Sequence, residues 1–141
     1  MTTINLDTFA EHLRWAEGSR SYPYECTAGK LTIGVGRNLE AKGLSDDEIQ
    51  YLLDNDIADT IEGAETLPYW ENLCGVRQLV VADMIFNLGL KRFKGFVNTN
   101  KYLLAGDYAH AADEMVDSKW YRQTGRRAIR LVAAMRTGIW K

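Results

Sequence analysis

The sequence predicts an α+β fold, a mostly helical chain whose few strands are gathered in one short N-terminal stretch. Apolar residues recur at helical spacing before residue 18, and again from about residue 46 to the end. Between these segments, residues 19–33 lose that period and become rich in aromatic and β-branched residues, which favour strands. The 141 residues, 46% of them hydrophobic, are enough for one domain with its own core.

The first predicted helix covers the helical pattern of residues 6–13 and ends near Gly18. Asn5 or Asp7 is expected to cap its N-terminus. Glu17 then lies in the last turn, where the negative end of the helix dipole favours a protonated carboxyl. This position is poor for stability and useful for an acid catalyst.

Residues 19–33 predict a β-hairpin with Gly29 at its turn. Gly34 and Gly36 follow as alternating glycines. The remaining glycine and the lysine of a phosphate-binding loop are missing, so we interpret the pair as a place where backbones pack closely.

A long helix is predicted from Asp46 to about Glu65, because Ser45 and Glu48 form a capping box before an apolar face. Its length of about 30 Å is enough to connect a small hairpin lobe to a larger helical lobe. Pro68 suits the first turn of a short helix that follows.

The strongly apolar helix over residues 76–88 is expected to be the buried centre of the second lobe, with Gly89 ending it. Three further glycines divide the remainder into short helices: Gly95, Gly106 and Gly125. We therefore expect a single domain over residues 1–141, with a hairpin lobe at about 18–44 and a linking helix at about 46–65. The helical lobe is expected at about 68–141, together with the N-terminal helix.

The charge distribution and the absence of known ligand-binding motifs limit the partners that the sequence predicts. The net charge is −2, but residues 1–66 hold thirteen acids against five Lys or Arg, whereas residues 119–141 hold seven Lys or Arg and no acid. This basic end fits either a solvated helix face or attraction to an anionic envelope. His12 and His110 lack metal-ligand spacing, and no nucleotide or zinc motif occurs, so we expect no metal, no cofactor and no nucleic-acid partner.

Two cysteines permit one disulfide at most, and we expect both to be reduced. Cys74, between Leu73 and Gly75, is predicted to be a core residue. Cys26 lies in the hairpin segment, eight residues after Glu17.

Glu17, Cys26 and Thr32 form a candidate site for cleaving a glycosidic bond. Such hydrolysis needs an acid that protonates the departing oxygen and a second group, normally a carboxylate, that holds or activates water on the other face of the sugar. Each residue also has an ordinary structural interpretation: a glutamate at a helix end, a small buried apolar cysteine, and a strand-forming threonine. None of the three residues indicates catalysis by itself.

The spacing of Glu, eight residues, Cys, five residues, Thr resembles the catalytic pattern of the phage lysozymes of the T-even type (glycoside hydrolase family 24), in which the second position is Asp or Cys. Further landmarks of that family follow in the same order: EG at 17–18, TIGVG at 32–36, FNLG at 86–89, WYRQT at 120–124 and RTGIW at 136–140. The resemblance extends from Glu17 to Trp140, and it implies the lysozyme-like arrangement of a hairpin lobe and a helical lobe.

The resemblance implies hydrolysis of the β-1,4 bond between N-acetylmuramic acid and N-acetylglucosamine in peptidoglycan, in a cleft between the two lobes. Glu17 would be the general acid, and Cys26 with Thr32 would place and activate the attacking water, with inversion. Arg127 matches a family arginine that pairs with the catalytic glutamate. Four residues match family positions that line the sugar cleft: Asn38, Phe86, Thr99 and Gln123.

Two features of this site complicate the chemistry that the resemblance implies. Arg127 favours an ionised Glu17, whereas a general acid has to be protonated when the leaving oxygen departs. A free thiol has a pKa of about 8.5, so a neutral Cys26 is a weak base. Cys26 is therefore interpreted as a thiolate base, a transient nucleophile or a group that positions water.

Resemblance to phage endolysins also implies a biological role, the lysis of a host cell. No run of about 18 apolar residues occurs, and the acidic N-terminal segment does not have a basic stretch followed by an apolar one. We therefore expect a monomer that stays in the host cytoplasm until a holin releases it to the periplasm and cell wall, without a stable protein partner. The lack of a second, wall-binding domain favours a thin, Gram-negative wall.

Three alternative functions use the same residues differently. A lytic transglycosylase would cleave the same bond but leave no water for Cys26 to guide. A catalytically silent, lysozyme-like glycan-binding module has no need of the set of acid, thiol and hydroxyl. A cysteine peptidase or amidase would pair Cys26 with His12 or His110, which leaves Glu17 and Thr32 unused.

Overall fold

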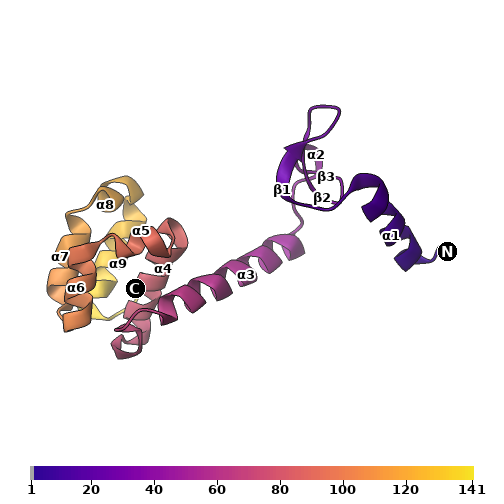
Figure 1. Cartoon of the computed structure of the whole chain (residues 1–141). Coiled ribbons are helices and arrows are strands. Elements are labelled where there is room, and N and C mark those ends of the chain that lie inside the picture. The colour runs from indigo at the N-terminus through magenta and orange to yellow at the C-terminus, as the bar shows by residue number, and fades with distance from the viewer. Residues whose placement is uncertain (1) are drawn as a thin grey trace. The chain divides into compact units, whose positions relative to one another are not determined.

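The computed structural model describes residues 2–141 and confirms an α+β fold, mostly helical with one small antiparallel sheet (Figure 1). Contacts within the chain divide it into two compact units, of which the first ends at Tyr51 and the second begins at Leu52. The elements in chain order are α1 (Leu6–Glu17), β1 (Arg20–Glu25), β2 (Leu31–Gly34), β3 (Arg37–Asn38), α2 (Leu39–Lys42), α3 (Asp46–Glu65), the 3-10 helix η1 (Trp70–Asn72), α4 (Gly75–Leu88), α5 (Leu90–Lys94), α6 (Val97–Ala105), α7 (Tyr108–Val116), α8 (Lys119–Thr124) and α9 (Arg126–Thr137). The boundary between the units falls inside α3, and α1 belongs to the first unit. The predicted grouping of that helix with the helical lobe stays a prediction.

Both ends of helix α1 lie where the sequence predicts them. The Asn5 side chain accepts a hydrogen bond from the backbone N–H of Thr8 at 3.0 Å, so Asn5 rather than Asp7 is the cap. At the other end, Gly18 has a positive φ of 76°, which stops the helix directly after Glu17. Glu17 is therefore the last residue of α1.

The sheet has three antiparallel strands in the order β1-β2-β3, one more than predicted. Gly29 lies in the turn between β1 and β2 with a φ of 74°, as expected. Thr32 is in the central strand, with Tyr24 opposite it on β1 and Asn38 opposite it on β3. The two-residue β3 has no alternating pattern of its own, which is why the sequence did not indicate it.

The predicted capping box at the start of α3 is confirmed. The Ser45 N–H donates to the Glu48 carboxylate at 2.8 Å, and the Glu48 N–H donates to the Ser45 hydroxyl at 3.3 Å. Arg37 donates to the same carboxylate at 2.9 Å and to the Gly43 carbonyl at 3.1 Å. These bonds connect β3 and the loop before α3 to the first turn of that helix.

In the second unit, the predicted helix ends at Gly89, Gly95, Gly106 and Gly125 are confirmed. One break was missed, between α7 and α8, where no glycine occurs. Ser118 starts α8 there by accepting a hydrogen bond from the Tyr121 N–H at 3.1 Å. Among the described residues, no helix is both long enough and apolar enough to cross a membrane.

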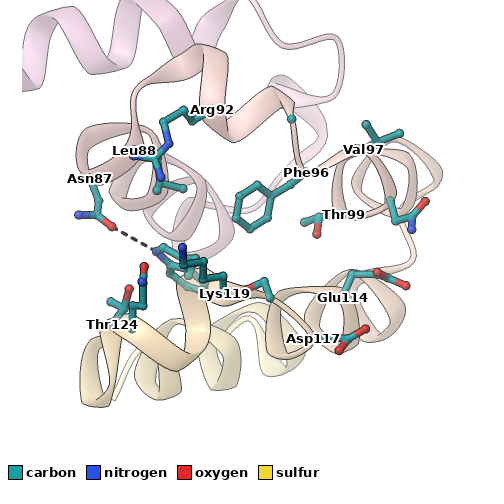
Figure 2. A pocket seen from close by; sticks show the side chains of 15 residues that line it. Asn87, Leu88, Arg92, Phe96, Val97, Thr99, Glu114, Asp117, Lys119 and Thr124 are labelled. Carbon is teal, nitrogen blue, oxygen red and sulfur yellow. Dashed lines mark hydrogen bonds between the residues drawn. The ribbon is translucent and has the colours of Figure 1, made fainter.

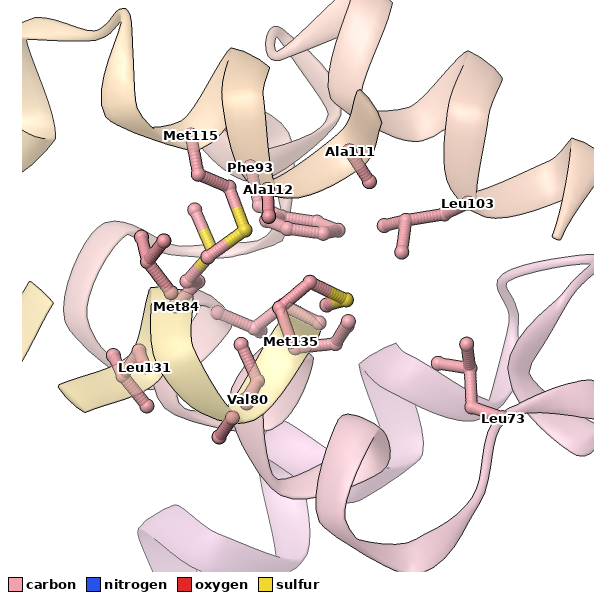
Figure 3. Packing of buried hydrophobic residues seen from close by; sticks show 14 of the residues in the cluster. Leu73, Val80, Met84, Phe93, Leu103, Ala111, Ala112, Met115, Leu131 and Met135 are labelled. Carbon is pink, nitrogen blue, oxygen red and sulfur yellow. The ribbon is translucent and has the colours of Figure 1, made fainter. Parts of the chain in front are cut away.

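The core of the second unit surrounds α4, which packs against α5 and α9 (Figure 3). Its members include Val80, Val81, Met84 and Ile85 of α4, with side chains from the other helices around them. These helices contribute Phe93, Leu103, Ala111, Ala112, Met115, Leu131 and Met135. The central position predicted for α4 is therefore confirmed.

Two other predictions about the residues in and next to α4 were wrong. Leu79 and Phe86 of α4 are 41% and 47% exposed, so the buried face is narrower than the apolar residues suggested. Cys74, predicted in the core, is exposed because it occupies the N-cap position of α4, outside the packed face. The Arg77 and Val76 N–H groups of this first turn, together with the Arg77 guanidinium, lower the pKa of Cys74.

Candidate active site

The carboxylate of Glu17 lies directly against Gly36, which follows the central strand. A β-carbon built on Gly36 would be 2.9 Å from Glu17 Oε2 and 3.1 Å from its carboxyl carbon. Gly36 also has a φ of 68°, where only glycine is unstrained. Gly34 has the same φ, but nothing lies within 4 Å of a β-carbon there. Gly36 therefore packs closely against a side chain and not against a second backbone as predicted, and the close-packing interpretation is wrong for Gly34.

Cys26 begins the tight turn between β1 and β2. Its N–H donates to the Lys30 carbonyl at 2.9 Å, and its carbonyl accepts from the Gly29 N–H at 2.8 Å. The N–H groups of Lys30 and Ala28 lower the pKa of the half-buried thiol, and this effect exceeds the opposite effect of burial. The turn therefore favours the thiolate that a base requires.

The Thr32 hydroxyl also lowers the pKa of the Cys26 thiol, by less than the two backbone N–H groups do. Its side chain is 3% exposed, and its hydroxyl donates to the Lys30 carbonyl at 2.8 Å. A hydroxyl has one proton, so Thr32 has to release that carbonyl before it donates to Cys26. The structure thus brings the predicted thiol and hydroxyl together around the Lys30 backbone.

Asn38 has a structural role that the sequence analysis missed. Its side-chain oxygen accepts from the Ala41 N–H at 3.0 Å and caps α2. An Asn just before a short helical segment is the signal that would have found it. Asn38 also lies opposite Thr32 in the sheet, so it belongs to the same unit as Glu17 and Cys26.

In the second unit, Thr99 and Gln123 line one pocket of about 620 Å³, which is within the range of small-ligand sites. Thr99 is 2% exposed. Trp120 Nε1 donates to the Asn87 side chain at 3.2 Å in the wall of this pocket (Figure 2). Its rim carries both signs of charge, with Arg92, Lys119, Glu114 and Asp117. Such a lining suits a ligand that has hydroxyl and amide groups.

Asn87 and Trp120 are among the pocket residues that the site prediction missed. Both are in segments that carried the family resemblance, and Trp120 was interpreted as a packing residue. It is 5% exposed and does pack in the core, but its indole N–H faces Asn87. Figure 2 shows Glu114 and Asp117 together, on the far side of the pocket from Asn87.

Phe86 does not share that pocket. It lines a second, apolar groove of about 660 Å³ together with Leu79, Trp70 and Ile57. Arg127 lies in the same groove. The four predicted sugar-binding residues therefore divide among the first unit, the polar pocket and this groove.

Arg127 has an acidic partner that the sequence did not indicate. Its Nε donates to both carboxylate oxygens of Asp83, at 3.0 and 3.2 Å. Arg127 belongs to the second unit and Glu17 to the first, so their predicted pairing stays a prediction.

The acid at the end of α1, the thiol in the turn after β1 and the buried hydroxyl on β2 lie in one compact unit, and a helical unit follows it in the chain. Residues 14–136 match the phage lysozyme family, and the chain belongs to it. It is therefore an enzyme of the lysozyme class, as the resemblance predicted.

Several curated proteins are similar over most of this chain. Probable T4-type lysozymes 1 and 2 of Dictyostelium discoideum are 24% and 25% identical to it, over 94% and 96% of this chain and 96% and 98% of their own lengths. The pre-baseplate central spike protein Gp5 of Enterobacteria phage T4 is 28% identical over 93% of this chain and 28% of its own length. Similar chains thus occur both as whole proteins and as part of a longer one.

Proposed function

We propose that this enzyme is a muramidase, which hydrolyses the β-1,4 bond between N-acetylmuramic acid and N-acetylglucosamine of peptidoglycan. The observation that carries the proposal is the Glu17 carboxyl, placed against Gly36 in the same unit as the turn that lowers the pKa of Cys26. Membership of the phage lysozyme family supports it.

In the proposed reaction, Glu17 gives its proton to the departing glycosidic oxygen as the bond to the anomeric carbon breaks. Water attacks the same carbon from the opposite face and loses its proton to Cys26, which Thr32 helps to orient. The anomeric configuration is inverted. A proton then returns from Cys26 to Glu17 through solvent, which restores both groups.

The resemblance also supports the roles proposed for the second unit. Arg127 would stabilise the carboxylate that Glu17 becomes when it gives its proton to the departing oxygen. Thr99 and Gln123 would bind the glycan in the polar pocket, while Asn38 and Phe86 would contact it elsewhere. The amide and hydroxyl groups of the pocket are suited to the acetamido and hydroxyl groups of these sugars.

Digestion of purified peptidoglycan by the wild type and by Glu17→Gln, followed by mass analysis of the fragments, tests the proposal. We expect fragments that end in reducing muramic acid from the wild type and none from a folded Glu17→Gln variant. The matched control is Glu25→Gln, an exposed glutamate at the end of β1, which should cleave normally. Anhydro-muramic ends would instead identify a transglycosylase, and binding to sacculi without cleavage by any variant would identify a silent module.

The role of Cys26 needs its own pair of variants. If Cys26 accepts the water proton, Cys26→Asp should retain substantial activity and Cys26→Ala should lose most of it. Cys74→Ala, which removes the other thiol from an exposed position, is the control and should remain active. A fully active Cys26→Ala variant would refute the role.

We further propose that the enzyme acts in host-cell lysis by a phage, as a monomer that a holin releases from the cytoplasm to the cell wall. Similarity to a protein of phage T4 supports a phage origin. Expression in Gram-negative cells with and without a holin tests this role. We expect lysis only when both proteins are present, and lysis by the enzyme alone would refute the dependence on a holin.

A further inference from the structure

One peptide unit of the hairpin, the one between Lys30 and Leu31, connects the thiol and the hydroxyl of the candidate active site. Its carbonyl oxygen, on Lys30, accepts the Cys26 N–H at 2.9 Å and the Thr32 hydroxyl at 2.8 Å. A peptide carbonyl has two lone pairs, so these two bonds use its full capacity. The orientation of this peptide unit therefore sets both the backbone position of Cys26 and the direction of the Thr32 hydroxyl.

Glu40 holds the opposite side of the same peptide unit. Its Oε1 accepts the Leu31 N–H at 3.0 Å, from a position nine residues along the chain. Because a peptide unit is planar, the Leu31 N–H and the Lys30 carbonyl turn together, and a partner that fixes one fixes the other. The pairing of β2 with β3 ends at Thr32 and Asn38. A side chain from the first turn of α2 thus satisfies an N–H that lies just beyond this pairing.

The charge of Glu40 favours the arrangement that the proposed reaction uses. A carboxylate binds an N–H more strongly than a neutral oxygen does, and it polarises the peptide unit, so that the carbonyl oxygen becomes a better acceptor. The Thr32 proton is then kept on the Lys30 carbonyl, and the Thr32 oxygen offers its lone pairs to water. A Cys26 thiolate that receives no bond from this hydroxyl is the stronger base.

The backbone bond, rather than the nearby ion pair, is the contact that fixes the Glu40 side chain. Lys30 Nζ is 3.9 Å from Glu40 Oε2, and the two side chains are 55% and 49% exposed. Ion pairs as exposed as this one contribute little. Helix α2, which carries Glu40, is itself held at its start by the Asn38 cap.

We propose that Glu40 is a positioning residue for the reaction, which fixes the Lys30–Leu31 peptide unit so that Cys26 and Thr32 keep the orientation in which they act on water. This inference rests on the proposed function. Glu40 acts through the backbone, by its bond to the Leu31 N–H. The sequence carried no signal for this role, because no spacing rule marks a contact between a side chain and a backbone N–H nine residues earlier.

Kinetics of two Glu40 variants test the inference on the full chain, with soluble, uncrosslinked glycan strands as substrate. Glu40→Ala is expected to lower kcat by about tenfold and to change KM by less than about twofold, because the loss is one of orientation and not of sugar binding. Glu40→Gln has an amide oxygen that can still accept the Leu31 N–H, so it should recover most of the rate.

The matched control is Glu48, whose carboxylate also accepts a backbone N–H of the first unit, that of Ser45 at 2.8 Å. Glu48→Ala should lower Tm but leave kcat unchanged. Nuclear magnetic resonance gives an independent readout of the proposed bond. The Leu31 N–H should exchange with solvent more slowly in the wild type and in Glu48→Ala than in Glu40→Ala.

The outcomes separate this inference from the proposed function. An unchanged kcat in Glu40→Ala, an equal loss in Glu48→Ala, or a Glu40→Gln variant as slow as Glu40→Ala overturns the positioning role. Glu17→Gln in the same assay reports on the proposed function separately, because it leaves this peptide unit intact. Its inactivity supports the general-acid assignment and its normal cleavage refutes that assignment, whatever the rate of Glu40→Ala. Thermal unfolding of every variant verifies that each one is folded.

Discussion

Replacing Gly36 by Ala is the sharpest single test of the candidate active site. The new methyl group would lie 2.9 Å from Glu17 Oε2 and 3.1 Å from the carboxyl carbon. Non-bonded carbons are ordinarily about 3.5–4.0 Å apart, so the carboxyl has to retreat by roughly half an ångström. Because the Glu17 side chain is flexible, it can move rather than prevent folding.

Two effects of this change have different sizes. Placing alanine at a φ of 68° costs about 1–2 kcal/mol, which lowers Tm by roughly 3–8 °C. The displaced carboxyl affects catalysis separately. A misplacement of about 1 Å costs on the order of 100-fold in rate, so half that distance predicts a loss of about tenfold in kcat.

Gly34→Ala separates the two effects, because Gly34 has the same φ of 68° with open space around its β-carbon position. Both variants should lose similar stability in thermal unfolding, but only Gly36→Ala should lose activity in an assay of new reducing ends on peptidoglycan. Equal activities of the two variants would refute the placement of Glu17 against Gly36.

Three further predictions concern charge and hydrogen bonding. The Arg37 guanidinium, together with the N–H and hydroxyl of Ser45, lowers the pKa of Glu48 from 4.5 to about 2. The ionised form of Glu48 therefore stabilises the fold above pH 4.5, and this effect is lost as pH falls toward 2. Chemical unfolding should therefore show the wild type to be more stable than Glu48→Gln near neutral pH and equal to it near pH 2, and a constant difference would contradict the pairing. In a Cys74→Ser background, the ultraviolet absorbance of the Cys26 thiolate should show a pKa below that of the same thiol in the unfolded chain, and an equal or higher pKa would contradict the effect of the turn. Arg77→Met should cost about 1–3 kcal/mol in urea unfolding, because the guanidinium donates to two carbonyls at the C-terminal end of α9, at 2.8 and 3.1 Å; an unchanged stability would refute this role.

Local features of the fold were determined by the sequence. Asn5, the Ser45–Glu48 box and the glycines that follow α1, α4, α5, α6 and α8 act through backbone groups only a few residues away, so their effect is visible in the sequence. The helices α1 and α3 begin and end where predicted for this reason. The spacing of Glu17, Cys26 and Thr32 likewise identified the family and the enzyme class before any contact was known.

Contacts between residues far apart in the chain were decided by tertiary structure. Arg127 and Asp83 are 44 residues apart, and neither the apolar pattern of α4 nor the basic pattern of α9 indicates which charges meet. The exposure of Phe86 and Leu79, and the shared pocket of Thr99 and Gln123, also depend on which helix faces pack together. Periodicity tells which residues share a face of a helix, whereas packing alone decides what that face meets.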